Sequence, residues 1–123
     1  MFRKFNSGET VQLGNCTQKW NYLYIDDFTD MISRMMEKNI DTGIYNISGV
    51  DTRVLREFVT EIYHLSNQTG NYEFGNNIVN PEGTPDLEPV IKKVDSVIGT
   101  HKITTFSDGI REIMKRIEEE SFV

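Results

Sequence analysis

The sequence contains a single cysteine, Cys16, and this scarcity limits the chemistry that the chain can carry. One thiol can form neither an internal disulfide bond nor a two-cysteine metal site. Only two histidines are present, and neither His64 nor His101 has a second histidine at the spacing of a zinc site. We therefore expect no disulfide and no metal centre, and a reducing, cytoplasmic location.

Basic residues and long apolar runs are also few. The chain has 13 lysines and arginines against 19 aspartates and glutamates, which gives a net charge of −6. The longest basic cluster is the pair Lys92-Lys93, which is too small to bind a nucleic-acid backbone. No apolar run approaches the roughly 18 residues of a membrane span, and the N-terminal "MFRKFNSGET" lacks the apolar core of a signal peptide. The sequence thus predicts neither nucleic acid nor a membrane as a partner.

The length of 123 residues suits one domain, and the pattern of apolar residues predicts an α+β fold. Three stretches show the 3.6-residue period of a helix. Their N-cap candidates are Asp26, Asp51 or Thr52, and Ser107. Short β-branched and aromatic runs predict strands at residues 10–13, 20–25, 44–48 and 72–74, and an edge strand at 90–93. We expect a small sheet of short strands packed with about three principal helices.

An acidic pair, Asp26-Asp27, lies between an aromatic run and a helix. Adjacent residues of a helix point about 100° apart, so two such carboxylates do not converge on one substrate atom. Asp26 is a good N-cap, and Asp27 lies where the helix dipole favours negative charge. Helix initiation is the favoured interpretation, and a hydrolase that uses this pair is the less favoured one.

The aromatic run before this pair is the stronger functional candidate. On a strand, Trp20, Tyr22 and Tyr24 would share one face. Such a face serves either as core or as a stacking platform for a base or a sugar. Residues 75–89 hold all three prolines and predict a long loop, a kind of segment that often carries function.

Five short motifs follow one another along nearly the whole chain. They are "WNYLYIDD" at 20–27, "YNISG" at 45–49, "LRE" at 55–57, "KKVDSVIG" at 92–99 and "FSDGI" at 106–110. In this order and at these gaps they resemble the second half of NAD-dependent sugar-nucleotide epimerases and dehydratases, the extended short-chain dehydrogenase/reductases.

The resemblance implies the C-terminal, substrate-binding lobe of such an enzyme. In the family, an N-terminal Rossmann domain binds NAD or NADP on a glycine-rich turn and supplies a Tyr-x-x-x-Lys pair. The chain has no GxGxxG motif, and no tyrosine has a lysine four residues later. We therefore expect residues 1–123 to form a single lobe that lacks the Rossmann domain, carries no cofactor and is inactive alone.

The resemblance also implies a nucleoside-diphosphate sugar as the ligand. Many members place an arginine at the start of the aromatic strand, where it reaches the diphosphate. No arginine stands there in this chain, and Lys19 can supply only a point charge in its place. The predicted substrate-binding residues are Gln12, Lys19, Trp20, Asn21, Arg53 and Arg56.

A second hypothesis stays open beside the first. The chain could be a free-standing α+β binding or interaction module derived from such a lobe. Without a partner domain, such a module would expose an apolar face. Self-association into a homo-oligomer would then cover that face.

Overall fold

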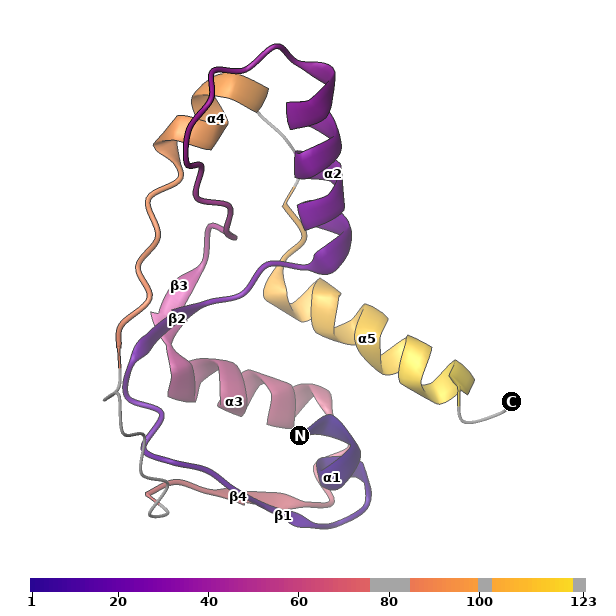
Figure 1. The fold of residues 1–123 in the computed structure, drawn as a ribbon. Helices are drawn as coiled ribbons and strands as arrows, with labels where there is room; N and C mark the ends of the chain where they lie inside the picture. Colours follow the sequence, from indigo (N-terminus) through magenta and orange to yellow (C-terminus); the bar gives the residue numbers. More distant parts are fainter. Residues whose placement is uncertain (76–84, 100–102, 121–123) are drawn as a thin grey trace.

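The computed structural model describes residues 1–75, 85–99 and 103–120 (Figure 1). Its helices are α1 (Phe2–Asn6), α2 (Ile25–Glu37), α3 (Leu55–Leu65), α4 (Lys92–Ile98) and α5 (Phe106–Glu120). Its strands are β1 (Thr10–Gln12), β2 (Lys19–Asn21), β3 (Thr52–Val54) and β4 (Asn71–Glu73). This arrangement confirms the α+β class and its three principal helices, which are α2, α3 and α5. Among the helices described, none is long and apolar enough to cross a bilayer.

The strands pair as two separate two-stranded sheets. β1 runs parallel to β4, with Val11 opposite Tyr72. β2 runs antiparallel to β3, with Trp20 opposite Arg53. Because each strand has only three residues, the interior is built mainly by helices.

The structure has two apolar clusters, one on α2 and α4 and the other on α1 and α3, and Figure 1 shows these two pairs of helices well apart. In one, Met31 of α2 packs with Val94 and Ile98 of α4, and each of the three is at most 4% exposed. In the other, the buried ring of Phe5 from α1 meets Tyr63 of α3 edge-on, with the centroids 5.2 Å apart. The helix α5 packs against α3.

The first strand–helix junction differs from the prediction. β2 ends at Asn21, and α2 begins at Ile25 with Tyr24 at its N-cap. The predicted strand over residues 20–25 is therefore wrong beyond Asn21, and its aromatic side chains do not share the face of one strand. Asp26 is not the N-cap. It lies with Asp27 in the first turn of α2, where the positive end of the helix dipole stabilises both negative charges.

Two other predicted strands are wrong. Residues 44–48 form no ladder with any residue that the structure describes, and the strand before α3 is β3. At residues 90–93 the chain turns instead into α4. Ile91, Val94 and Ile98 recur at the spacing of a helix, and all three pack in the cluster around Met31. This burial of one helical face outweighs the strand preference of the β-branched residues.

The last helix begins one residue earlier than its predicted cap. Thr105 directly precedes α5, and its hydroxyl accepts a hydrogen bond from the amide of Asp108 at 3.2 Å. Ser107 lies inside the first turn, where its hydroxyl donates to Glu61. Thr105 therefore caps the helix, and Ser107 joins α5 to α3.

Replacing Gly109 by alanine is expected to stabilise the protein. Gly109 is buried in α5, and an added Cβ would lie 3.5 Å from the ring of Tyr24, an ordinary van der Waals contact. Glycine inside a helix costs about 0.5–1 kcal/mol relative to alanine. We expect Gly109→Ala to raise the free energy of unfolding by about that amount in urea denaturation. A destabilised alanine variant would contradict this packing.

Candidate functional site

A hollow of about 390 Å³ lies beside the N-terminal half of α5. We call it the α5 pocket. Its walls come from the exit of β2, the approach to β3, residues 103–106 and α5 itself. Several of its apolar side chains are open to solvent: Tyr22 is 48% exposed, Ile25 56%, Val50 68% and Ile113 43%. This apolar, open hollow could receive a flat ring or an apolar partner surface.

Three aromatic rings form one wall of the pocket. Phe58 of α3, only 1% exposed, has its ring centroid 5.0 Å from that of Tyr22 and 4.7 Å from that of Phe106. Burial raises the pKa of the Tyr22 hydroxyl above its ordinary value of 10.0. The hydroxyl therefore stays protonated at neutral pH and can donate a hydrogen bond to a ligand.

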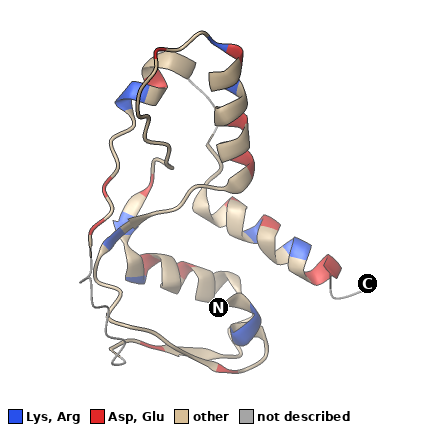
Figure 2. Cartoon of the chain, in the orientation of Figure 1, with Lys and Arg blue, Asp and Glu red and all other residues tan. Residues whose placement is uncertain are grey.

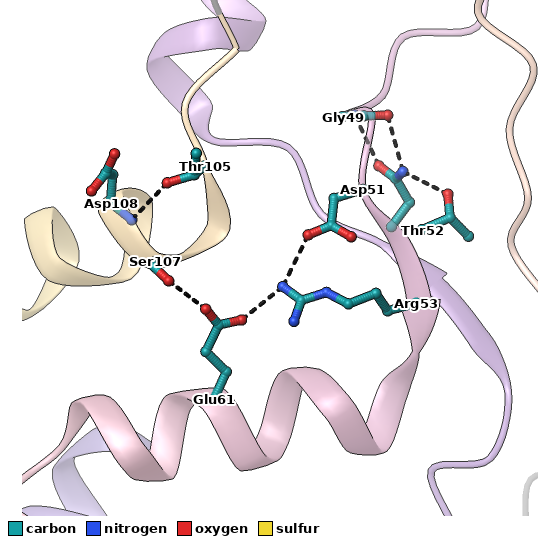
Figure 3. Close-up of polar contacts among 9 residues, drawn as sticks. Gly49, Asp51, Thr52, Arg53, Glu61, Thr105, Ser107 and Asp108 are labelled. Atoms are coloured by element: carbon teal, nitrogen blue, oxygen red, sulfur yellow. Dashed lines mark hydrogen bonds and ion pairs between the residues drawn. The ribbon is translucent and has the colours of Figure 1, made fainter.

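Arg53 of β3 lies against this aromatic wall. Its guanidinium carbon is 4.2 Å from the ring centroid of Phe58 and 5.2 Å from that of Phe106. Its Nη2 contacts the carboxylates of Asp51 at 3.0 Å and Glu61 at 2.7 Å (Figure 3). The charge of this predicted residue is therefore already balanced within the protein.

Glu61 connects this arginine to α5. Figure 3 shows its carboxylate between the Arg53 guanidinium and the Ser107 hydroxyl, which donates to it. Burial alone would raise the pKa of Glu61. The hydrogen bonds from Ser107 and Arg53, and the charges of Arg53 and Arg111, outweigh burial and lower this pKa below its ordinary value of 4.5. The folded protein therefore favours the charged form of Glu61.

This shift predicts how stability depends on pH. Because the folded pKa of Glu61 is lowered, the stabilisation that it provides is present above pH 4.5 and is lost as the pH falls through the folded pKa. We expect Glu61→Gln to lose less stability than the wild type on acidification below that pH, measured by urea denaturation. Glu57→Gln, which changes an exposed carboxylate of the same helix, is the control. Equal acid dependence in wild type and Glu61→Gln would refute this role.

Asn21 positions another wall of the pocket. Its side chain is 8% exposed. Nδ2 donates to the carbonyl of Gly49 and to the hydroxyl of Thr52, both at 3.0 Å. Oδ1 accepts from the amide of Gly49 at 2.8 Å. Both amide donors are thus used to hold residues 49–52, and a direct contact of Asn21 with substrate stays a prediction.

Lys19 lies at the other end of β2, beside the acidic segment 86–88. Its amide donates to Oδ1 of Asp86 at 2.8 Å, and its carbonyl accepts from the amide of Leu87 at 2.8 Å. Its ammonium contacts Glu88 at 2.6 Å, with both side chains at least half exposed. A phosphate could reach Lys19 only in competition with this exposed and weak ion pair.

The remaining predicted residues are divided between two places. Trp20 is half-buried on β2, so four of the six predicted residues lie on the β2–β3 ladder. Gln12 donates to Glu73 across the β1–β4 pair at 3.1 Å. The Nε of Arg56 donates to the carbonyl of Asn15 at 2.6 Å. Gln12 and Arg56 are therefore engaged outside that ladder.

The acidic pair, Asp26 and Asp27, binds two residues that line the α5 pocket, Arg116 and Thr104. Asp27 accepts hydrogen bonds from the amide and hydroxyl of Thr104, at 2.6 and 2.8 Å. Asp26 contacts Arg116 of α5 at 3.2 Å. These contacts tie the start of α2 to α5 and agree with the structural interpretation of the pair.

The pattern of the sequence did not single out Glu61 or Phe106 as site residues. The sequence predicted only that the apolar residues of the last helix share one face, and the structure shows that Ile110 and Ile113 of this face line the pocket. Only the motif at 106–110 pointed to this region.

No group of three or more potential ligands could hold a metal ion in the part of the chain that the structure describes. Cys16 is buried, and burial raises the pKa of its thiol although the charge of Arg56 acts in the opposite direction. Residues 76–84 of the predicted loop at 75–89 are not among the residues that the structure describes. His101 is not among them either.

Neither a protein-family model nor a curated protein sequence matches the chain. Solved structures do match. UDP-glucuronic acid 4-epimerase from Bacillus cereus, in complex with UDP-glucuronic acid and NAD, has a TM-score of 0.72 and 22% identity over 89% of this chain and 35% of that one. dTDP-glucose 4,6-dehydratase from Bacillus anthracis, in complex with NAD, has a TM-score of 0.75 and 17% identity, over 96% of this chain and 37% of that one.

The chain has the fold of part of these enzymes. MoeE5 in complex with UDP-glucuronic acid and NAD also matches, with a TM-score of 0.72 and 18% identity over 94% of this chain and 40% of that one. The resemblance drawn from the motifs is thus confirmed at the level of the fold. The chain spans 35% to 40% of the length of these three matched structures.

Proposed function

We propose that residues 1–123 form the substrate-binding portion of an NAD-dependent sugar-nucleotide epimerase or dehydratase. The observation that carries the proposal is the shared fold, which covers nearly the whole chain but little more than a third of each matched enzyme. The GxGxxG turn and the Tyr-x-x-x-Lys pair are missing from the sequence. In this proposal the chain is therefore inactive alone, and its partner is a Rossmann domain that binds NAD or NADP.

The α5 pocket supports the proposal by its chemistry. A base or sugar ring can stack on an aromatic side chain, and Tyr22 offers a half-exposed ring with a protonated hydroxyl. Lys19 lies three residues before Tyr22 and would bind the diphosphate once Glu88 is displaced. Trp20, Asn21 and Arg53 would hold the surrounding ladder in place.

Titration of the isotope-labelled chain with UDP-glucuronic acid and with dTDP-glucose tests this proposal by NMR. We expect weak but saturable shifts around Tyr22, Val50 and Phe106, because such sites are completed between two domains. NAD should produce no saturable shift. Tight binding of NAD would contradict the proposal, and so would the absence of binding by every nucleotide sugar.

Lys19→Gln is expected to weaken the binding of these nucleotide sugars about threefold to tenfold, because one charge-assisted contact is lost. Stability should change little, since the ion pair with Glu88 is exposed to solvent. Binding of uridine, which lacks phosphate, should not change. Lys115→Gln on α5 removes the same charge at another exposed position and serves as the control. Equal effects of the two variants would exclude a phosphate contact for Lys19.

The mass of the native polypeptide distinguishes a lobe from a free-standing module. Immunoprecipitation and intact mass spectrometry would give about twice 14.2 kDa or more for a two-domain enzyme. A species at 14.2 kDa would favour the module, for which the exposed apolar side chains of the α5 pocket are the supporting observation. The cytoplasmic location stays a prediction in both cases.

A further inference from the structure

Arg116 is the basic residue that lines the α5 pocket, and two carboxylates already contact it. Its guanidinium lies 3.2 Å from Asp26 and 3.5 Å from Glu112. Figure 2 shows acidic residues at the start of α2, where Asp26 is followed by Asp27. A carboxylate of a ligand that displaced one of these acids from Arg116 would still face the others at short range, and like charges repel.

Asp51 is the acidic residue that lines the pocket. It contacts Arg53 at 3.0 Å, and Arg53 contacts a second carboxylate, that of Glu61, at 2.7 Å. The side chain of Asp51 is 51% exposed, whereas that of Arg53 is 25% exposed and lies over the ring of Phe58. A ligand in the pocket therefore meets the carboxylate of Asp51 more readily than the guanidinium that balances it.

The other basic residues of α5 do not offset these acids at the pocket. Arg111 pairs with Asp108 at 3.3 Å. Because successive residues of a helix point about 100° apart, Arg111 and Lys115 lie on the other side of α5 from Ile113, which lines the pocket. Negative charge is therefore in excess around the pocket, within the part of the chain that the structure describes. A cleft with low-dielectric walls strengthens such a local field.

The hydrogen-bonding groups of the pocket suit a sugar better than a base. Carboxylate oxygens only accept hydrogen bonds, and Asp51 is exposed enough to accept them from a ligand. The hydroxyl of Tyr22 can donate one hydrogen bond and accept others. A sugar presents several hydroxyl donors to these acceptors and can lay its C–H face on the ring of Tyr22. A uracil or thymine ring presents mainly carbonyl acceptors, for which the pocket has few donors.

We propose that the α5 pocket receives the sugar of the nucleotide sugar and selects a sugar that carries no carboxylate. This inference rests on the proposed function and specifies its ligand further. An uncharged sugar leaves the ion pairs of Arg53 and Arg116 intact. A uronic acid must compete with the carboxylates that already occupy both arginines, and it approaches an excess of negative charge.

NMR titration of the full chain with UDP-glucose and with UDP-glucuronic acid tests the proposal, because the two ligands differ only in a hydroxymethyl group or a carboxylate on the sugar. We expect UDP-glucose to bind at least about threefold more tightly at low salt. The difference should shrink in about 1 M salt, where the Debye length is only about 3 Å. UDP-glucose should also shift the signals of Tyr22 and Ile113 in a way that UDP alone does not.

Asp51→Asn removes a carboxylate from the pocket and should reduce the preference for UDP-glucose about twofold or more. The control is Glu37→Gln, which removes an exposed carboxylate at the end of α2 and should leave the preference unchanged. Equal affinities for the two ligands, or sugar-dependent shifts outside the pocket, would overturn this inference and leave the proposed function standing. A preference that survives both Asp51→Asn and high salt would arise from shape and would overturn it too. If no nucleotide sugar binds, the proposed function fails, and this inference fails with it.

Discussion

Replacing Gly49 by alanine is expected to lower the free energy of unfolding by about 3 kcal/mol or more. An added Cβ would clash with the carbonyl oxygen of Tyr22 and would lie 3.3 Å from Oδ1 of Asn21. The nearest atom belongs to the backbone, so it cannot move aside as a flexible side chain would. Either the exit of β2 or the approach to β3 must shift, and both form walls of the α5 pocket. Urea denaturation measures the loss, and chemical shifts of Tyr22 and Val50 report the displacement.

Gly14→Ala is the matched control for this change. An added Cβ at Gly14 meets no atom within 4 Å, so we expect an effect within about 0.5 kcal/mol. Asn21→Ala tests the same junction from the other side, because it leaves the amide of buried Gly49 without its acceptor. We expect a cost of about 1–3 kcal/mol for this variant. A neutral Gly49→Ala would show that the close approach of residues 22 and 49 is incorrect.

Phe58→Ala is expected to destabilise the protein by about 3–5 kcal/mol. Phe58 is 1% exposed and contacts the rings of Tyr22 and Phe106 as well as the guanidinium of Arg53. Alanine would leave a cavity under the α5 pocket and remove the surface on which Arg53 lies. Thermal and urea denaturation would both detect a loss of this size, which is a large part of the stability of a small domain.

Phe28→Ala provides the comparison on an exposed ring. Phe28 is 40% exposed on α2, so we expect a loss of about 1 kcal/mol or less. Phe58→Leu retains most of the buried volume and should cost clearly less than Phe58→Ala. If Phe58→Ala and Phe28→Ala had equal costs, the aromatic wall would not be the centre of packing between α3 and α5.

The helices were the most predictable part of the fold. The apolar residues of α2, α3 and α5 recur with the helical period, and this period reflects one buried face within a single element. Their exact starts were less predictable. Tyr24 precedes α2 and Thr105 precedes α5, whereas the predicted caps, Asp26 and Ser107, contact distant partners on other helices.

The strands were predicted less well, because a strand needs a partner that local sequence does not identify. The predicted strand at 44–48 has the right side-chain alternation and no ladder, whereas β3 pairs with β2 without a strong pattern of its own. Of the candidate site, the sequence predicted Lys19, Trp20, Asn21 and Arg53, which share one ladder. Their contacts with substrate stay predictions.

Composition and pattern were sufficient to predict the α+β class, the scarcity of metal-ligating and basic residues, and the order of motifs that led to the epimerase and dehydratase fold. These properties depend on which residues are present and on their spacing within one helix or strand, and both can be read from the sequence. Three other features could be found only in the folded protein: Asn21 binds Gly49, Glu61 balances the charge of Arg53, and α5 forms the pocket with Tyr22 and Phe58. Each of these depends on atoms far apart in the chain, and their distances are set by the packing of several elements together.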